Sequence, residues 1–242
     1  MSQLDSLLAA ICADPEDMAP RRAYAAAIQP IDPERAQLID LQLALRDARR
    51  AGKDPDARHS RELIRNRGAA WAGPLATHVD YYMFWSGFVE EIEVDAAALL
   101  ATDFRALAPI RHLRVRRLVP RVAEIAKLPL LAQCHSLDIQ SCRLTDVDLA
   151  ELVASPLVRG VRILRVGNNP EVTLDGMRMI ARADLPDLVF VDSTGTQAEL
   201  VTRASAWDGS EATFTRAHAQ LVDEFGERPW LMARDEPSLD AI

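Results

Sequence analysis

The chain has 242 residues, a net charge of −8, 49% hydrophobic residues and 26% charged residues. This balance is typical of a globular protein and argues against a largely disordered chain, and no apolar run reaches the roughly 18 residues that a membrane span needs. The N-terminus lacks the basic start and apolar stretch of a signal peptide, so we expect a cytoplasmic protein.

The three cysteines indicate neither a disulfide framework nor a zinc site. Cys12, Cys134 and Cys142 are an odd number and contain no C-x-x-C pair. We therefore expect no metal and no cofactor.

Residues 1–72 are expected to form a helical region. Leu4, Leu7, Leu8 and Ile11 recur at helical spacing, and Pro33 suits the first turn of a later helix. Five of the chain's aromatic residues then crowd a short segment: Tyr81, Tyr82, Phe84, Trp85 and Phe88. Because the first unit of a repeat array has no neighbour to cover its end, we interpret this cluster as a cap; ligand stacking is the alternative.

A repeated pattern follows. Residues 137–144 read L-x-I-x-x-C-x-L, which is typical of the strand and turn of a leucine-rich repeat. The same phase returns along the chain, with central apolar anchors at Ile92, Leu113, Leu137, Leu164 and Leu188. Their spacings are about 21, 24, 27 and 24 residues, within the range of roughly 20–29 for this repeat. Helix-forming segments follow the strands, so residues 73–196 predict an α/β leucine-rich repeat solenoid with a parallel concave sheet and convex helices.

Two side chains fit the turn of such a repeat. Cys142 and Asn169 occupy the position at which the repeat favours Asn or Cys, where the side chain bonds the backbone of the turn. Thr145 and Asp148 resemble a capping box for the helix that follows.

Residues 197–242 break the period and predict a C-terminal cap with an acidic tail. A helix is expected over 211–225 and a short strand over 229–232. The segment carries 4 basic and 9 acidic residues.

The residues between the apolar anchors are expected to point out of the concave face. Aligning the anchors places Glu93, Arg114, Asp138 and Arg165 in one column of alternating charge. Such a ladder keeps the face soluble, and it also offers a polar docking surface for another protein. The candidate partner-binding residues are Glu91, Glu93, Asp95, His112, Arg114, Arg116, Ser136, Asp138, Gln140 and Arg165.

The run Arg111–Arg117 invites a nucleic-acid interpretation. Alternation divides it, however, between the two faces of a strand, and the chain as a whole is acidic. We therefore expect a partner with a mixed or modestly basic surface, and weak nucleic-acid binding is kept only as an alternative.

Catalytic motifs are not evident. The chain has no P-loop, no G-x-G-x-x-G, no G-x-S-x-G and no H-E-x-x-H, and its five histidines have no metal-ligand spacing. Cys134 and His135 are neighbours on a predicted strand, so they face opposite sides and form no dyad. We expect no enzyme; an unrecognised active site, or a role as an enzyme subunit, is the alternative.

The N-terminal region resembles a known bacterial domain. Residues 7–17 read LLAAICADPED, residues 20–25 read PRRAYA, and residues 32–42 read DPERAQLIDLQ. These stretches are similar to the repeat-companion domain that precedes leucine-rich repeats in bacterial proteins. Its usual D-W-L is Ala26-Ala27-Ile28 here, so any role of that tryptophan is lost. The resemblance implies a repeat scaffold and brings no catalytic residues.

The patterns together favour a protein-binding scaffold. A candidate task is neutralising a toxin or effector, as an immunity protein or inhibitor does.

Overall fold

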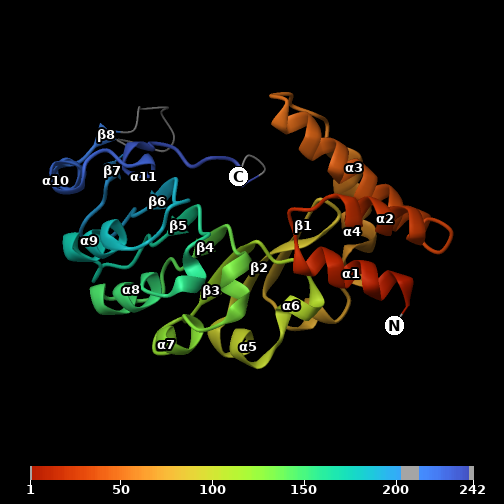
Figure 1. Ribbon diagram of the computed structural model, residues 1–242, viewed down its shortest axis with the longest axis horizontal. Helices are drawn as coiled ribbons and strands as arrows, with labels where there is room; N and C mark the ends of the chain where they lie inside the picture. Colours follow the sequence, from red (N-terminus) through yellow and green to blue (C-terminus); the bar gives the residue numbers. More distant parts are fainter. Residues whose placement is uncertain (1, 203–212, 240–242) are drawn as a thin grey trace. The chain divides into compact units, whose positions relative to one another are not determined.

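The computed structural model describes residues 2–202 and 213–239 and is an α/β protein (Figure 1). Its main sheet has the strand order β1-β2-β3-β4-β5-β6, in which β3 to β6 run parallel and β1 pairs antiparallel with β2. The chain divides into two compact units, residues 2–94, 101–111 and 239, and residues 95–100, 112–202 and 213–238. The expected boundaries near residues 72 and 196 stay a prediction.

The first unit combines helices with a β-hairpin. Its elements are α1 (Gln3–Ala13), α2 (Ala19–Ile28), α3 (Pro33–Arg50), α4 (Arg58–Ala72), the 3-10 helix η1 (Gly73–Thr77), β1 (Tyr81–Trp85) and most of β2 (Phe88–Asp95), with α6 (Phe104–Leu107). Asp32 caps α3 by accepting from the Arg35 N–H, and Pro33 opens the helix. The core is apolar: Ile11, Ala25, Ile39, Leu43 and Phe88.

The hairpin turn of the first unit lies close against α3. Gly87 has φ +87°, and a Cβ there would lie 2.8 Å from the Cα of Ile39. Gln42 fixes the same turn, because its amide accepts from the Gly87 N–H at 2.8 Å and donates to the Phe84 carbonyl at 2.9 Å. Only glycine combines this backbone conformation with so close an approach.

The second unit repeats strand and helix. Its elements are β3 (His112–Arg116), α7 (Val122–Ile125), η2 (Pro129–Gln133), β4 (Ser136–Asp138), α8 (Asp146–Val153), η3 (Pro156–Val158), β5 (Ile163–Arg165), α9 (Leu174–Arg182), β6 (Phe190–Asp192), β7 (Val201–Thr202), β8 (Thr213–Phe214), α10 (Arg216–Phe225) and α11 (Pro229–Met232), and α5 (Ala96–Ala101) precedes them. Helices α7, α8 and α9 follow one another along one side of β3 to β6 (Figure 1). The capping box expected at Thr145 and Asp148 opens α8.

The register of the parallel strands confirms three of the expected anchors and corrects the last one. Leu113 pairs with Leu137, and Leu137 pairs with Leu164. Leu164 then pairs with Val191, not with the expected Leu188. Leu188 is buried three residues before the anchor, in the position that Val161 holds in the preceding repeat of the pattern. An apolar residue buried just ahead of the strand therefore misled the alignment.

The turns after β4 and β5 are joined by Asn169, which is fully buried. Its Oδ1 accepts from the N–H groups of Cys142 and Leu144, at 3.0 Å each. Its Nδ2 donates to the carbonyls of Ile139, Val166 and Gly167. The buried Cys142 thiol donates to the carbonyl of Val115 at 3.1 Å. Asn169 thus bonds backbone groups of the turns, as the sequence pattern predicts, whereas Cys142 bonds the backbone of the neighbouring strand β3.

The C-terminal cap differs in part from expectation. The expected helix is α10, which begins after the capping residue Thr215, while residues 211 and 212 lie outside the described part. The expected strand over 229–232 is wrong, because these residues form the short helix α11. Pro229 occupies its first turn, where a fixed φ and a missing N–H suit a helix better than a sheet.

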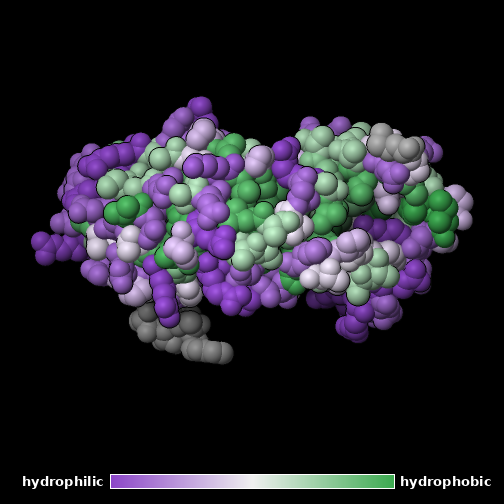
Figure 2. Space-filling view, turned by 90° about the horizontal axis from the view of Figure 1, so that it is seen from below, coloured by the Kyte–Doolittle hydropathy of each residue, from purple (hydrophilic) through white to green (hydrophobic). Residues whose placement is uncertain are grey.

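Figure 2 shows a face on which hydrophilic residues are interspersed with smaller apolar patches. Large apolar side chains that are exposed include Ile31, Tyr81, Met83, Val147 and Met232. Within the described residues, no helix has the length and hydropathy of a bilayer-crossing segment.

Replacing Asn169 with Leu is expected to destabilise the second unit strongly. The two side chains are similar in size, but Leu leaves two buried N–H groups without an acceptor, at about 1–3 kcal/mol each. Urea unfolding should show a lower free energy of unfolding by about 2–6 kcal/mol. Gln197→Leu removes one exposed amide contact and is the control that should change little. Equal midpoints for the two variants would contradict the role given to Asn169.

Candidate functional site

The candidate site is the polar column that the parallel strands of the second unit present. In the register of β3 to β6, Arg114 pairs with Asp138, Asp138 with Arg165, and Arg165 with Asp192. Neighbouring strands lie about 4.8 Å apart, so opposite charges face each other at every step. The side chains of Arg114, Asp138 and Arg165 are 46%, 13% and 17% exposed, which makes Arg114 the most accessible of the three.

Polar contacts link the side chains of neighbouring strands in the column. The Arg114 Nε lies 3.7 Å from Asp138 Oδ2. Arg165 donates from Nη1 to the Ser136 hydroxyl at 2.8 Å, and Gln140 donates from Nε2 to Asp192 Oδ2 at 3.1 Å. The column is therefore a connected network, in which the side chains of Arg114, Asp138, Arg165 and Asp192 each contact a polar neighbour.

The aspartates of this face also hold the ends of their strands. Asp95, Asp138 and Asp192 each accept from the N–H two residues ahead, at 2.9, 3.0 and 3.0 Å. This is the Asx-turn geometry that a short carboxylate favours. Burial raises the pKa of Asp138, and the N–H of Gln140 and the guanidinium groups of Arg114 and Arg165 oppose that rise. The Ala97 N–H is the main reason that the pKa of Asp95 is lowered.

A segment from the C-terminal region contacts the column from outside the sheet. Glu236 pairs with Arg165 through both carboxylate oxygens: Oε2 accepts from Nε at 3.1 Å, and Oε1 accepts from Nη2. Two parallel bonds of this kind are the strong form of an arginine–carboxylate pair. Residues 233–238, which we call the C-terminal strap, thus lie over the polar side of β5.

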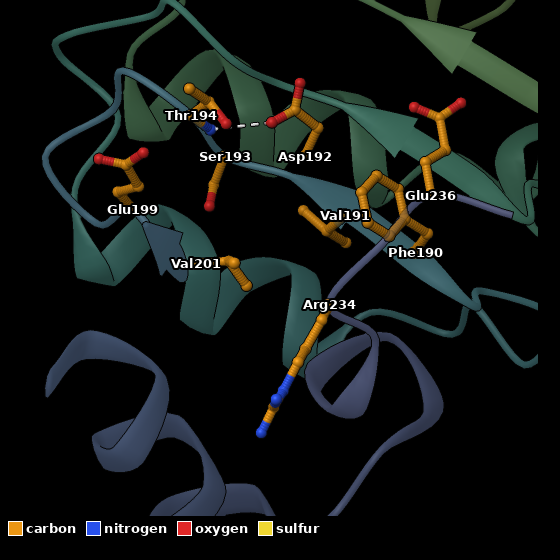
Figure 3. A pocket seen from close by; sticks show the side chains of 9 residues that line it. All are labelled: Phe190, Val191, Asp192, Ser193, Thr194, Glu199, Val201, Arg234 and Glu236. Carbon is orange, nitrogen blue, oxygen red and sulfur yellow. Dashed lines mark hydrogen bonds between the residues drawn. The ribbon is translucent and has the colours of Figure 1, made fainter. Parts of the chain in front are cut away.

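A cavity of about 430 Å³ lies beside β6 and the strap (Figure 3). Its acidic lining residues are Asp192, Glu199 and Glu236, and Val201 and Phe190 add apolar surface. Arg234 also lines it and extends away from β6 (Figure 3). The Arg234 guanidinium carbon lies 5.0 Å from the Phe214 ring centroid, which gives the strap a second point of attachment.

The remaining predicted residues differ in how exposed their side chains are. His112 and Ser136 are buried, with exposed fractions of 4% and 1%, so they offer little surface to a partner. Arg116 is exposed, and Gln140 and Asp95 are half-buried, with Asp95 paired to Arg117.

Two predicted residues, Glu91 and Glu93, belong to the first unit. Both are half-buried, and Glu91 accepts from the Trp85 indole N–H at 3.0 Å. Their membership of one docking surface with the second-unit residues stays a prediction.

Two residues of the site escaped the sequence analysis. Asp192 follows Val191, the true anchor of β6, and it was missed because the sequence alignment placed that anchor at Leu188. The 27-residue spacing from Leu137 to Leu164, applied once more from Leu164, leads to Val191 and so to Asp192. Glu236 lies 71 residues from Arg165 and outside the repeated pattern, so no periodicity points to the contact.

The described residues contain neither a metal-ligand cluster nor an accessible thiol. Within residues 2–202 and 213–239, no group of three or more His, Cys, Asp or Glu side chains is arranged to hold a metal ion. All three cysteines are buried, and burial raises the pKa of Cys12 to about 11 and that of Cys134 to about 12. Thiols in such surroundings are poor nucleophiles.

Comparison with known proteins adds no relative, since no family model, no curated protein and no solved structure matches the chain.

Replacing Asp138 with Asn tests the electrostatics of the column. Because the folded chain raises the pKa of Asp138, ionisation costs stability, and wild type becomes less stable as pH rises from the unfolded pKa, about 3.9, to the folded one. Asn keeps an acceptor oxygen and does not titrate. Its melting temperature relative to wild type is therefore expected to rise across this window and to stay higher at neutral pH.

Asp95→Asn is the matched control with the opposite sign. The lowered pKa of Asp95 stabilises the fold above the unfolded pKa, and this contribution is lost as pH falls through the folded pKa. The control should thus be less stable than wild type at neutral pH and approach it in acid. Thermal melts from about pH 3 to pH 7 measure both variants. The same pH trend in both would refute this assignment.

Proposed function

We propose that the chain is a non-enzymatic protein-binding scaffold of the leucine-rich repeat kind, which holds its partner on the polar side of β3 to β6. The observation that carries the proposal is the pair between Glu236 and Arg165. A peptide segment from outside the sheet already rests on this side and uses a side-chain contact to do so. A surface that takes one segment in this way is suited to take another.

The regular backbone of the polar side of β3 to β6 supports the same function. Its strands have matched registers, and the turns behind them are fixed by Asn169 and Cys142, so the side chains project from a rigid frame. Rigid presentation lowers the entropy lost on binding. Arg114 and Arg116 are exposed on this frame, and their conformations are set less by packing than those of the buried residues around them.

The charge pattern favours a protein over a nucleic acid. The column carries two arginines and two aspartates in alternation, and a polyanion would meet a carboxylate at every second position. A protein surface of mixed charge can match the alternation. The resemblance of residues 7–42 to a repeat-companion domain agrees with a scaffold, and we include that region in the proposal.

A candidate task for the scaffold is neutralising a toxin or effector. An acidic binding protein of this size suits the task, and the genes beside its own test it. A toxin gene there supports immunity, whereas a metabolic operon supports the alternative of an enzyme subunit.

Arg114→Glu is expected to weaken partner binding while leaving the fold intact. The substitution places two acidic side chains opposite each other on adjacent strands, but exposed ion pairs contribute only about 0–1 kcal/mol to stability. Affinity purification with mass spectrometry supplies the partner, which is then titrated against both chains at two salt concentrations. The loss should be largest at low salt, because salt screens exposed charges.

Arg159→Glu is the matched control for this experiment. Arg159 is an exposed arginine of the same unit that pairs with Asp184 at 3.2 Å, away from the polar column. Its reversal changes the net charge equally and should leave binding nearly unchanged. If Arg114→Glu and Asp138→Arg both bind as wild type does, the polar column is not the docking site, and the helices of the second unit become the place to search.

A further inference from the structure

The C-terminal strap is fixed to the second unit at both ends of a short span. Before it, Trp230 and Leu231 of α11 are buried, and the Leu231 carbonyl lies 2.9 Å from His218 Nε2. Within it, Arg234 lies over the Phe214 ring, and Glu236 pairs with Arg165. The pair with Arg165 is the contact that brings the strap onto the polar column.

Arg165 is placed to bind a carboxylate that its own strands do not supply. Asp138 on one side accepts from the Gln140 N–H, and Asp192 on the other accepts from the Gln140 side chain and the Thr194 N–H. Among the described residues, Arg165 forms its ion pair with Glu236 and with neither aspartate. Nη1 is held by Ser136, which leaves Nε and Nη2 aimed outward as a fork that fits one carboxylate.

We infer that the C-terminal strap is a built-in ligand of the polar column, and that the column takes an acidic partner segment whose aspartate or glutamate replaces Glu236. The second half rests on the proposed function. It sharpens the partner's chemistry: at Arg165 the partner presents a carboxylate, even where the rest of its surface is mixed or basic. The strap then competes with the partner and sets how tightly a partner must bind.

Tethering explains how so small a contact can compete. A single exposed ion pair binds weakly, but a strap joined to the same chain acts at an effective concentration in the millimolar range. A partner that offers the same carboxylate and further contacts along β3 to β5 displaces it. A partner that offers the carboxylate alone does not.

The test uses the full chain with Glu236→Gln, which keeps the strap and removes its carboxylate. The probe is a synthetic peptide with the sequence of residues 233–238, Ala-Arg-Asp-Glu-Pro-Ser, titrated to millimolar concentration. Nuclear magnetic resonance follows the backbone amides of β4 and β5 and the Nε–H of Arg165. Wild type should show little change, whereas the Glu236→Gln chain should show saturable shifts centred on Arg165.

Matched variants on both partners sharpen the result. A peptide with Gln in place of Glu should bind about tenfold more weakly or not at all, as expected when a charge-assisted bidentate contact is lost. Glu199→Gln removes a carboxylate that lines the same cavity without pairing with Arg165, and this chain should respond to the peptide as wild type does. Adding Arg165→Gln to Glu236→Gln should abolish the shifts.

The outcomes separate this inference from the proposed function. An unresponsive Glu236→Gln chain, or shifts that survive Arg165→Gln, overturns the strap as a ligand of the column, whatever the partner does. Peptide binding as expected, together with a partner that ignores Arg114→Glu and Asp138→Arg, supports the strap and removes the proposed docking site. Partner binding that strengthens in Glu236→Gln supports both.

Discussion

Hydrogen bonding of the buried turn backbone is the constraint on which the second unit depends. Cys142, Leu144 and Asn169 are buried in the turns after β4 and β5, so the backbone groups beside them need partners that water does not supply. Asn169 meets this need for two turns at once, because its amide bonds the turn after β4 and the end of β5 together. Strands β4 and β5 therefore end at paired residues, Asp138 and Arg165. The residue after each central anchor, such as Asp138 or Arg165, then projects at the same height, and the polar column is a consequence of that register.

The first unit meets a different constraint, since it buries charge. Glu90 and Arg21 are both fully buried, with Oε1 and Nη1 2.7 Å apart, and Arg111 approaches the other carboxylate oxygen at 3.3 Å. Burial raises the pKa of Glu90, and the two guanidinium groups oppose the rise. Arg21 also donates to the carbonyls of Pro15 and Ser86, so three acceptor groups, counting Glu90, surround its guanidinium group. Removing either partner would leave the other charge buried and uncompensated, which is the costly case.

The sequence predicts what depends on periodicity and misses what depends on contacts between distant segments. Leu113, Leu137 and Leu164 have the expected register because burial of one strand face imposes it. The misplaced anchor at Leu188 has a physical origin, since burial alone does not distinguish a strand residue from the residue that leads into the strand. The strap contact at Glu236 has no local signal, because a surface carboxylate gives no indication of which arginine it will meet.

In the function that we propose, alternating charge gives the column a specificity that its net charge does not. Two arginines and two aspartates sum to zero, so the column itself steers a partner weakly through long-range attraction. A partner shifted by one strand, about 4.8 Å, meets like charges at every contact, whereas a shift by two strands restores the match over half the length. The ladder alone therefore favours the full match only through the contacts that the shifted register loses. Arg165 adds a further preference, because its ion pair is with Glu236 and not with a carboxylate of the flanking strands, whereas the guanidinium group of Arg114 lies beside Asp138. A ligand that brings a carboxylate to Arg165 is fixed in one register, and Glu236 shows which position that is.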